Sequence, residues 1–207
     1  MAKQQYKKGV TPVGEALFAH VLKTEIIKKD GQEKDTGKFS IMLKLKDADK
    51  KALLNSINEE WEKFKNTLTG KKFKYDISNG IKEYKEEEYF KFSMNETIRL
   101  KSGETLHRTV PVFDTSCKDI SKTLTSLGNG SKVRIAYDLV PFYMSDKNYG
   151  ISLRLTGIQI IDLVEFNGST AESLGFGKTE GYVADEAEDE SNVFADGTED
   201  DNDEGDF

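Results

Sequence analysis

The residues that could do chemistry in this sequence are cations and aromatic rings along strand-like segments. Lys and Arg neutralise the phosphates of nucleic acid, and unpaired bases stack on flat aromatic rings. We therefore predict a groove that binds single-stranded nucleic acid through its cations and rings. The same residues could also be ordinary solvent-facing residues of an antiparallel sheet. The predicted DNA-binding residues are Lys38, Lys44, Lys91, Arg99, Lys132, Arg134, Phe142, Tyr143, Tyr149 and Arg154.

The charge of the chain is divided between its two parts. Residues 180–207 contain 13 acidic residues and no Lys or Arg. The other 179 residues contain all 30 basic residues and 24 of the 37 acidic ones, so their net charge is +6. Such asymmetry is typical of a nucleic-acid surface joined to an acidic arm, and also of an ordinary domain with a solubilising tail.

The last residue favours the first interpretation. A large aromatic side chain at the end of an acidic run has no core to join, and it lowers solubility unless something binds it. We therefore expect the end of the chain to contact a protein partner. The predicted partner-binding residues are Asp200, Asp201, Asp203, Glu204, Asp206 and Phe207.

Other chemistries find little support. Gly177-Lys178-Thr179 resembles the end of a phosphate-binding loop, but Glu172 stands where the first glycine is needed. The two histidines are far apart in sequence and no nucleophile elbow accompanies them. We expect no enzyme, no cofactor and no metal site, with a metal-dependent nuclease as a weaker alternative. The single Cys117 and the lack of an apolar run near 18 residues favour a cytoplasmic protein without a membrane span.

Periodicity predicts a mostly β protein with one helix. The stripe of Leu53, Ile57, Trp61, Phe64 and Leu68 predicts a helix over 48–68 with Asp47 as its N-cap, and favours a core role for Trp61 over base stacking. Strand-like patterns, mostly alternating, predict strands at 14–27, 39–46, 71–77, 89–100, 105–113, 131–143 and 149–164. We expect loops at 28–38 and 82–88, and a strand end or bend at Pro141.

This order of elements predicts a small antiparallel barrel with an inserted helix and a disordered acidic tail. The expected domains are a single-stranded-DNA-binding domain over residues 1–175 and a tail over 176–207.

One stretch also resembles a known family. The sequence GSKVRIAYDLVP at 130–141 resembles the bacteriophage replication single-stranded-DNA-binding proteins of the short-tailed coliphage type. The similarity continues through 150–166, at Gly181-Tyr182-Val183-Ala184 and at the final Glu204-Gly205-Asp206-Phe207. One departure is that Phe142 and Met144 stand where the family has Tyr and Trp.

The resemblance implies an oligonucleotide-binding (OB) fold, which is a five-stranded antiparallel Greek-key barrel, here with extra strands. It also implies a tail-mediated homodimer, contacts with the phage DNA polymerase and primase-helicase, and strand annealing. We therefore expect a protein of the host cytoplasm that coats single-stranded DNA in phage replication, recombination and repair, with a tail that competes with DNA and recruits partners. The alternative is an acidic-tailed interaction or DNA-mimic protein that binds basic protein partners.

Overall fold

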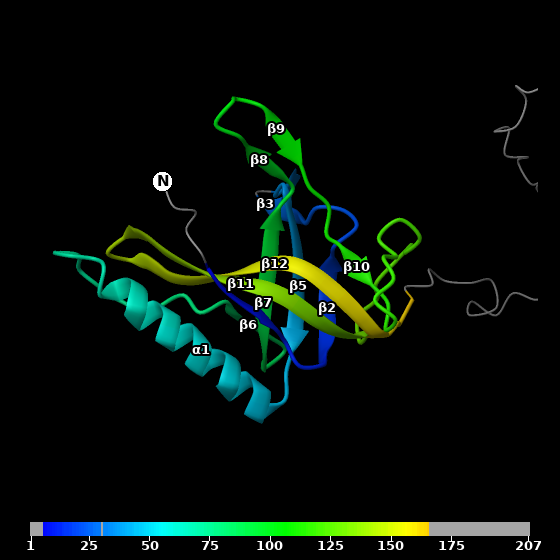
Figure 1. Ribbon diagram of the computed structural model, residues 1–207, viewed down its shortest axis with the longest axis horizontal. Coiled ribbons are helices and arrows are strands. Elements are labelled where there is room, and N and C mark those ends of the chain that lie inside the picture. The colour runs from blue at the N-terminus through cyan, green and yellow to red at the C-terminus, as the bar shows by residue number, and fades with distance from the viewer. Residues whose placement is uncertain (1–5, 30, 166–207) are drawn as a thin grey trace, which may run out of the picture. The chain divides into compact units, whose positions relative to one another are not determined.

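The computed structural model describes residues 6–29 and 31–165. Five strands of this part form a closed barrel in the order β2, β5, β7, β12, β11 and back to β2 (Figure 1). All contacts are antiparallel except that between β7 and β12, which is parallel. This is the topology of the OB fold, so the predicted fold class is confirmed. The barrel strands are β2 (Gly14–His20), β5 (Lys38–Lys44), β7 (Glu87–Asn95), β11 (Lys132–Ser145) and β12 (Asn148–Asp162).

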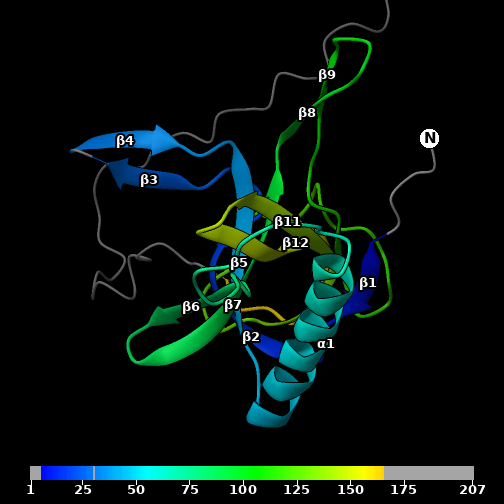
Figure 2. The same cartoon turned by 90° about the vertical axis from the view of Figure 1, so that its left-hand side faces the viewer.

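Three further strands extend the barrel sheet. β1 (Lys7–Val10) pairs with β11, β6 (Ile81–Tyr84) pairs with β7, and β10 (Val112–Phe113) runs parallel to β12. Two separate hairpins project from the same end of the barrel (Figure 2). They are formed by β3 (Ile26–Lys29) with β4 (Gln32–Asp35), and by β8 (Thr97–Arg99) with β9 (Thr105–His107).

The interior of the barrel is filled by alternate residues of its strands. Ile41 and Leu43 of β5, Phe92 of β7, Ile135 of β11 and Leu155 of β12 have no exposed side-chain surface. Since successive side chains of a strand point to opposite faces, the residues between them face outward. The alternation in the sequence therefore gives the correct inward face for each of these strands.

The helix α1 (Asp47–Lys65) lies between β5 and β6 in the chain and packs its apolar stripe on the barrel (Figure 2). Leu53, Ile57 and Trp61 are buried, which confirms the core role predicted for Trp61. The N-cap residue is Lys46 and not Asp47, and no side chain caps this end. Asp47 instead occupies the first turn, where a carboxylate interacts favourably with the helix dipole. No described helix is long and apolar enough to cross a membrane.

Several predicted boundaries were wrong where exposed hairpins interrupt the barrel. The predicted strand at 14–27 is divided into β2 and β3, and Phe18 has a positive φ of 49° beside a register shift in the β2–β5 pairing. The predicted loops at 28–38 and 82–88 contain β4 and most of β6, whereas 71–77 contains no strand. The strand predicted at 89–100 is divided into the end of β7 and the whole of β8. The strand predicted at 105–113 is divided into β9 and β10. Strands exposed on both faces carry no hydrophobic alternation, so the pattern could not reveal them.

Pro141 neither ends nor visibly interrupts β11, which continues to Ser145. Pro141 pairs with Ile151, whose amide donates to the Ser78 carbonyl and therefore points away from β11. In an antiparallel pair of this kind both nitrogens point outward, so the ladder loses no hydrogen bond at the proline. On its other side, the described part of β1 ends opposite Leu139, short of Pro141.

Candidate nucleic-acid interface

Register brings several polar and cationic residues onto one outer face of the barrel. Ser93 of β7 lies opposite Ser40 of β5 and opposite Arg154 of β12, and Arg154 lies opposite Asp138 of β11. Residues directly opposite one another share a face, and so do alternate residues of one strand. We call this surface the outer face. It carries Lys38, Ser40, Met42, Lys91, Ser93, Asn95, Asp138, Val140, Phe142, Ser152 and Arg154.

Three of the predicted cations lie on the outer face. Lys38 is exposed at the start of β5. The ammonium of Lys91 donates to both carboxylate oxygens of Glu25 at 2.6 and 2.8 Å. Burial raises the pKa of Glu25, but the hydrogen bond and charge of Lys91 lower that pKa by more. Arg154 lies over the ring of Tyr6, with its guanidinium carbon 4.9 Å from the ring centroid.

Phe142 is the predicted aromatic residue that lies on the outer face. It is half-buried and pairs across β11 and β12 with Gly150. Because glycine has no side chain, no cross-strand neighbour covers the ring from that position. Phe142 therefore offers a flat apolar surface next to the turn that joins β11 to β12.

Tyr149, in contrast, is not available for stacking on a base. The prediction that Tyr149 is a DNA-binding residue is therefore wrong. Its side chain is only 3% exposed, and its ring lies 5.4 Å from that of Trp61 at an interplanar angle of 18°. Its hydroxyl donates to the Tyr75 carbonyl and accepts from the Tyr75 amide. The ring therefore belongs to an aromatic cluster between α1 and the β11–β12 ribbon.

Tyr143 joins the same cluster from β11. Its ring lies parallel to that of Tyr149 at 6.0 Å and meets the ring of Phe73 edge-on. Its hydroxyl donates to the Lys72 carbonyl at 3.2 Å, and the Lys71 ammonium lies 5.3 Å from its ring centroid. In the pleat, Tyr143 points to the opposite side from Phe142, so the two predicted aromatic contacts do not form one platform.

Lys44 and Lys132 lie in a row of alternating charges across β11, β2, β5 and β7. Lys132 contacts Glu15 at 2.9 Å, Glu15 lies opposite Lys44, and Lys44 is ion-paired with Glu87. The hydrogen bond from Lys44 to Glu87 raises the pKa of the Lys44 ammonium. These two predicted cations already have carboxylate partners. Lys44 points to the same side of β5 as Lys38, Ser40 and Met42, but lies at the opposite end of that strand from Lys38.

The remaining predicted cations lie elsewhere. Arg134 donates to the Thr11 carbonyl at 3.3 Å and lines a cavity of about 390 Å³ with Val10, Phe113 and Cys117. Arg99 is exposed on β8 and pairs with Thr105 of β9, on the hairpin that follows the end of β7. Arg99 is four residues after Asn95, the last outer-face residue of β7. Arg134 lies nearer the start of β11 than Asp138, Val140 and Phe142, the outer-face residues of that strand.

Sequence reasoning missed Arg108, Tyr6 and His20. His20 lies opposite Ser40 and extends the outer face onto β2. Arg108 lies between β9 and β10, where one continuous strand was predicted, and Tyr6 immediately precedes β1, which was not predicted. The directions of these three side chains depend on where the neighbouring strands begin and end. The sequence pattern gave no signal for those strand ends.

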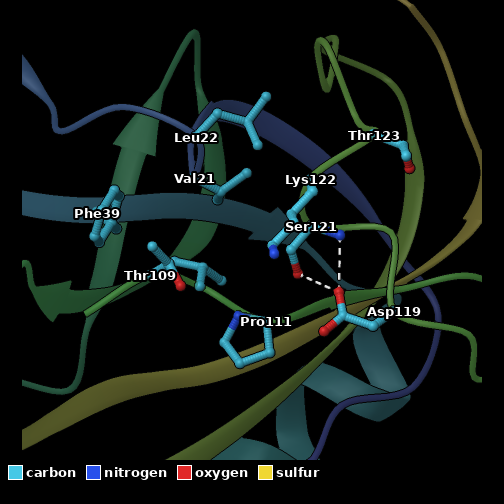
Figure 3. A pocket seen from close by; sticks show the side chains of 10 residues that line it. Val21, Leu22, Phe39, Thr109, Pro111, Asp119, Ser121, Lys122 and Thr123 are labelled. Atoms are coloured by element: carbon cyan, nitrogen blue, oxygen red, sulfur yellow. Dashed lines mark hydrogen bonds between the residues drawn. The ribbon is translucent and has the colours of Figure 1, made fainter. Parts of the chain in front are cut away.

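A cavity of about 620 Å³ lies beside the start of β5 (Figure 3). Its walls include Val21, Phe39 and Thr109, which directly follow His20, Lys38 and Arg108 in the chain. The walls are mainly apolar, but Asp119, Ser121 and Lys122 form a polar edge. Asp119 accepts hydrogen bonds from the hydroxyl and amide of Ser121 at 2.6 and 2.8 Å, and these bonds lower its pKa.

Comparison with solved structures identifies the fold. The crystal structure of gp2.5, a single-stranded-DNA-binding protein of bacteriophage T7, matches 87% of this chain and 100% of its own, with a TM-score of 0.60 and 20% sequence identity. The single-stranded-DNA-binding protein of bacteriophage Enc34 in complex with single-stranded DNA matches 78% of this chain and 89% of its own, with a TM-score of 0.52 and 14% identity. The chain has the fold of bacteriophage single-stranded-DNA-binding proteins.

The unbound Enc34 protein shares this fold of phage single-stranded-DNA-binding proteins, with a TM-score of 0.52, 13% identity and coverage of 81% of this chain and 89% of its own. No protein-family model and no curated protein sequence matches the chain. Over residues 6–29 and 31–165, no group of three or more His, Cys, Asp and Glu side chains is placed to hold a metal ion.

Proposed function

We propose that the chain binds single-stranded DNA across its outer face and coats DNA strands during phage replication and recombination. The observation that carries this proposal is the position of Lys38, Lys91, Phe142 and Arg154 on one face of the second to fifth barrel strands. OB folds bind oligonucleotides across the second and third strands and the adjoining loops. A solved neighbour of the same fold is in complex with single-stranded DNA.

The chemistry of this face suits an unpaired strand. The cations release condensed counterions when they neutralise phosphates, and Phe142 provides a ring for a base to stack on. The hydroxyls of Ser93 and Ser152, which are half-buried and exposed respectively, can donate to phosphate oxygens without base preference.

A binding titration tests the proposal. The full-length protein should retain labelled oligothymidine on a filter, bind the corresponding duplex more weakly, and lose affinity as salt rises. If it retains neither nucleic acid but binds a basic protein, the DNA-mimic alternative is correct instead. Cleavage of the oligonucleotide in the presence of magnesium would indicate a nuclease.

Replacing the ring on the outer face should weaken DNA binding. We expect Phe142→Ala to lower affinity for oligothymidine by about 1 kcal/mol, or about fivefold, because a stacked base loses its platform. The control is Tyr75→Ala, which removes an exposed ring in the segment between α1 and β6, outside the barrel strands. Equal loss of affinity in the two variants, measured by fluorescence titration, would reject stacking on Phe142.

The acidic tail, residues 176–207, lies outside the described residues, and its roles are part of the proposal. We propose that it competes with DNA for the cationic face and that DNA binding releases it. The released end then contacts phage DNA polymerase and primase-helicase through Asp200, Asp201, Asp203, Glu204, Asp206 and Phe207. The resemblance to the phage family also supports a homodimer formed through the tail, strand annealing and a place in the host cytoplasm.

Phe207→Ala should separate partner binding from DNA binding. Removing the terminal ring leaves the charge of the tail unchanged, so affinity for oligothymidine should stay within about twofold, because competition with DNA is electrostatic. Binding to the replicative polymerase, measured by surface plasmon resonance, should fall because the ring fills an apolar pocket on that partner. Unchanged polymerase binding would show that Phe207 is not an anchor.

A further inference from the structure

Arg154 of the outer face lies beside a carboxylate and near a second arginine, Arg108. Arg154 of β12 lies opposite Asp138 of β11, and its Nη1 atom is 3.9 Å from Asp138 Oδ2. Arg108 comes from the segment between β9 and β10, and its Nη2 donates to the Asn95 carbonyl. Asn95 is two residues after Ser93 on β7, and Ser93 lies opposite Arg154, so the contact with Asn95 brings Arg108 to the part of β7 beside Arg154. Burial and the charge of Arg154 both lower the pKa of the Arg108 guanidinium.

The polar groups of this cluster are incompletely paired. Arg108 Nε and Asp138 Oδ1 are the two buried side-chain polar atoms that have no hydrogen-bond partner within the described residues. The Arg154–Asp138 separation of 3.9 Å is longer than a hydrogen bond, whereas Lys91–Glu25 is 2.6 Å and Lys132–Glu15 is 2.9 Å. Buried polar groups in proteins are normally paired, so these exceptions indicate a missing partner.

The charge of the cluster shows which partner fits. Lys8 of β1 and Arg154 of β12 lie opposite Asp138 on its two neighbouring strands, and Arg108 is a further cation near Arg154. The cluster therefore has an excess of positive charge and several free N–H donors. A phosphate group accepts hydrogen bonds from guanidinium groups through two oxygens at once, and it would supply the missing anion.

We propose that Arg108 and Arg154 form a clamp for one phosphodiester of bound DNA, and that Asp138 holds Arg154 weakly until the phosphate replaces it. The inference rests on the proposed function and adds Arg108, which no sequence pattern indicated. Asp138 is a positioning residue in this arrangement. Its negative charge repels the incoming phosphate, so it weakens DNA binding at this site.

Asp138→Asn gives the sharpest test, because a gain of affinity cannot come from misfolding. Asparagine has nearly the same shape, and the change removes the charge that competes with phosphate. We expect oligothymidine to bind about threefold more tightly at low salt, with the gain fading as salt rises. The matched control is Glu59→Gln on α1. This change removes one negative charge from the ion pair between Glu59 and Lys7 of β1, and it should change DNA affinity little.

Arg108→Ala should weaken binding about fivefold and reduce the slope of log affinity against log salt by about 0.7, as expected for one lost phosphate contact on a single strand. Arg108→Lys should retain the slope and lose part of the affinity, since it keeps the charge but not the fork. In an Arg108→Ala background, Asp138→Asn should bring no gain. Circular dichroism melts establish that each variant is folded.

The Arg108 Nε–H resonance provides a readout that does not depend on DNA affinity. In the wild-type protein, oligothymidine and inorganic tripolyphosphate should each shift it. If oligothymidine fails to bind but tripolyphosphate shifts the resonance, the clamp stands and the proposed function falls. If the protein binds DNA but Asp138→Asn behaves like Glu59→Gln and Arg108→Ala keeps the wild-type salt slope, the clamp is overturned. If neither ligand shifts the resonance, the clamp is also overturned.

Discussion

Removal of residues 180–207 should tighten the binding of single-stranded DNA by about ten- to hundredfold at low salt, which corresponds to about 1.4–2.8 kcal/mol. This segment has 13 acidic residues and no basic ones, and it is tethered to a body with a net charge of +6. A tethered competitor acts at an effective concentration in the millimolar range, so even weak binding to the outer face reduces DNA affinity. Truncation removes this competition completely.

Salt dependence distinguishes competition from other effects of truncation. The attraction between tail and body is screened over about 10 Å at 0.1 M salt and about 3 Å at 1 M, so the advantage of the truncated protein should shrink as salt rises. A full-length variant with the acidic residues of 180–207 changed to Asn and Gln should bind DNA like the truncated protein. Equal affinities of full-length and truncated protein at every salt concentration would rule out competition.

Trp61→Ala should lower the free energy of unfolding by about 3–5 kcal/mol, as is typical when a large buried aromatic side chain is removed. Trp61 is 4% exposed, and the centroid of its ring lies 5.4–6.0 Å from those of Phe64, Phe73 and Tyr149. The loss combines apolar area returned to water with a cavity between α1 and the β11–β12 ribbon. Urea denaturation followed by circular dichroism measures the change.

Trp61→Ala should leave DNA affinity unchanged although it lowers stability. At a temperature where the variant remains folded, its affinity for oligothymidine should match that of the wild type, because Trp61 is covered by other rings. Trp61→Phe should recover part of the stability, since it keeps a ring in the cluster. A large loss of DNA affinity without a loss of stability would instead make Trp61 a base-stacking residue.

Elements with one buried face were predictable from the sequence. In β5, Phe39, Ile41 and Leu43 alternate with polar residues, and all three are buried. In α1, the stripe through Leu53, Ile57 and Trp61 has the helical spacing and packs on the barrel. These signals are strong because burial of apolar side chains on one face determines both the element and its orientation. The order of such elements was sufficient to predict a barrel with one inserted helix.

The candidate site was only partly predictable. Lys38, Lys91, Arg154 and Phe142 share the outer face, but Lys44 and Lys132 have carboxylate partners from neighbouring strands. Tyr149 looked like a surface ring in the pattern, yet it is covered by Trp61 of α1 and hydrogen-bonded to Tyr75. The sequence pattern does not show which strand lies beside a residue, and that neighbour decides whether a cation is free or an aromatic ring is accessible.

The amino-acid sequence alone thus determined the class of fold, the inward faces of β5, β7, β11 and β12, the separation of acidic tail from cationic body, and the core role of Trp61. Each of these properties depends on local periodicity or on composition, which a single chain displays directly. Only the tertiary structure decided which cations lie together on the outer face, that Tyr149 is buried, and that Arg108 approaches Arg154. These contacts join segments as distant as β1, β7 and β12, and they depend on strand register, where a shift of one residue moves a side chain to the opposite face.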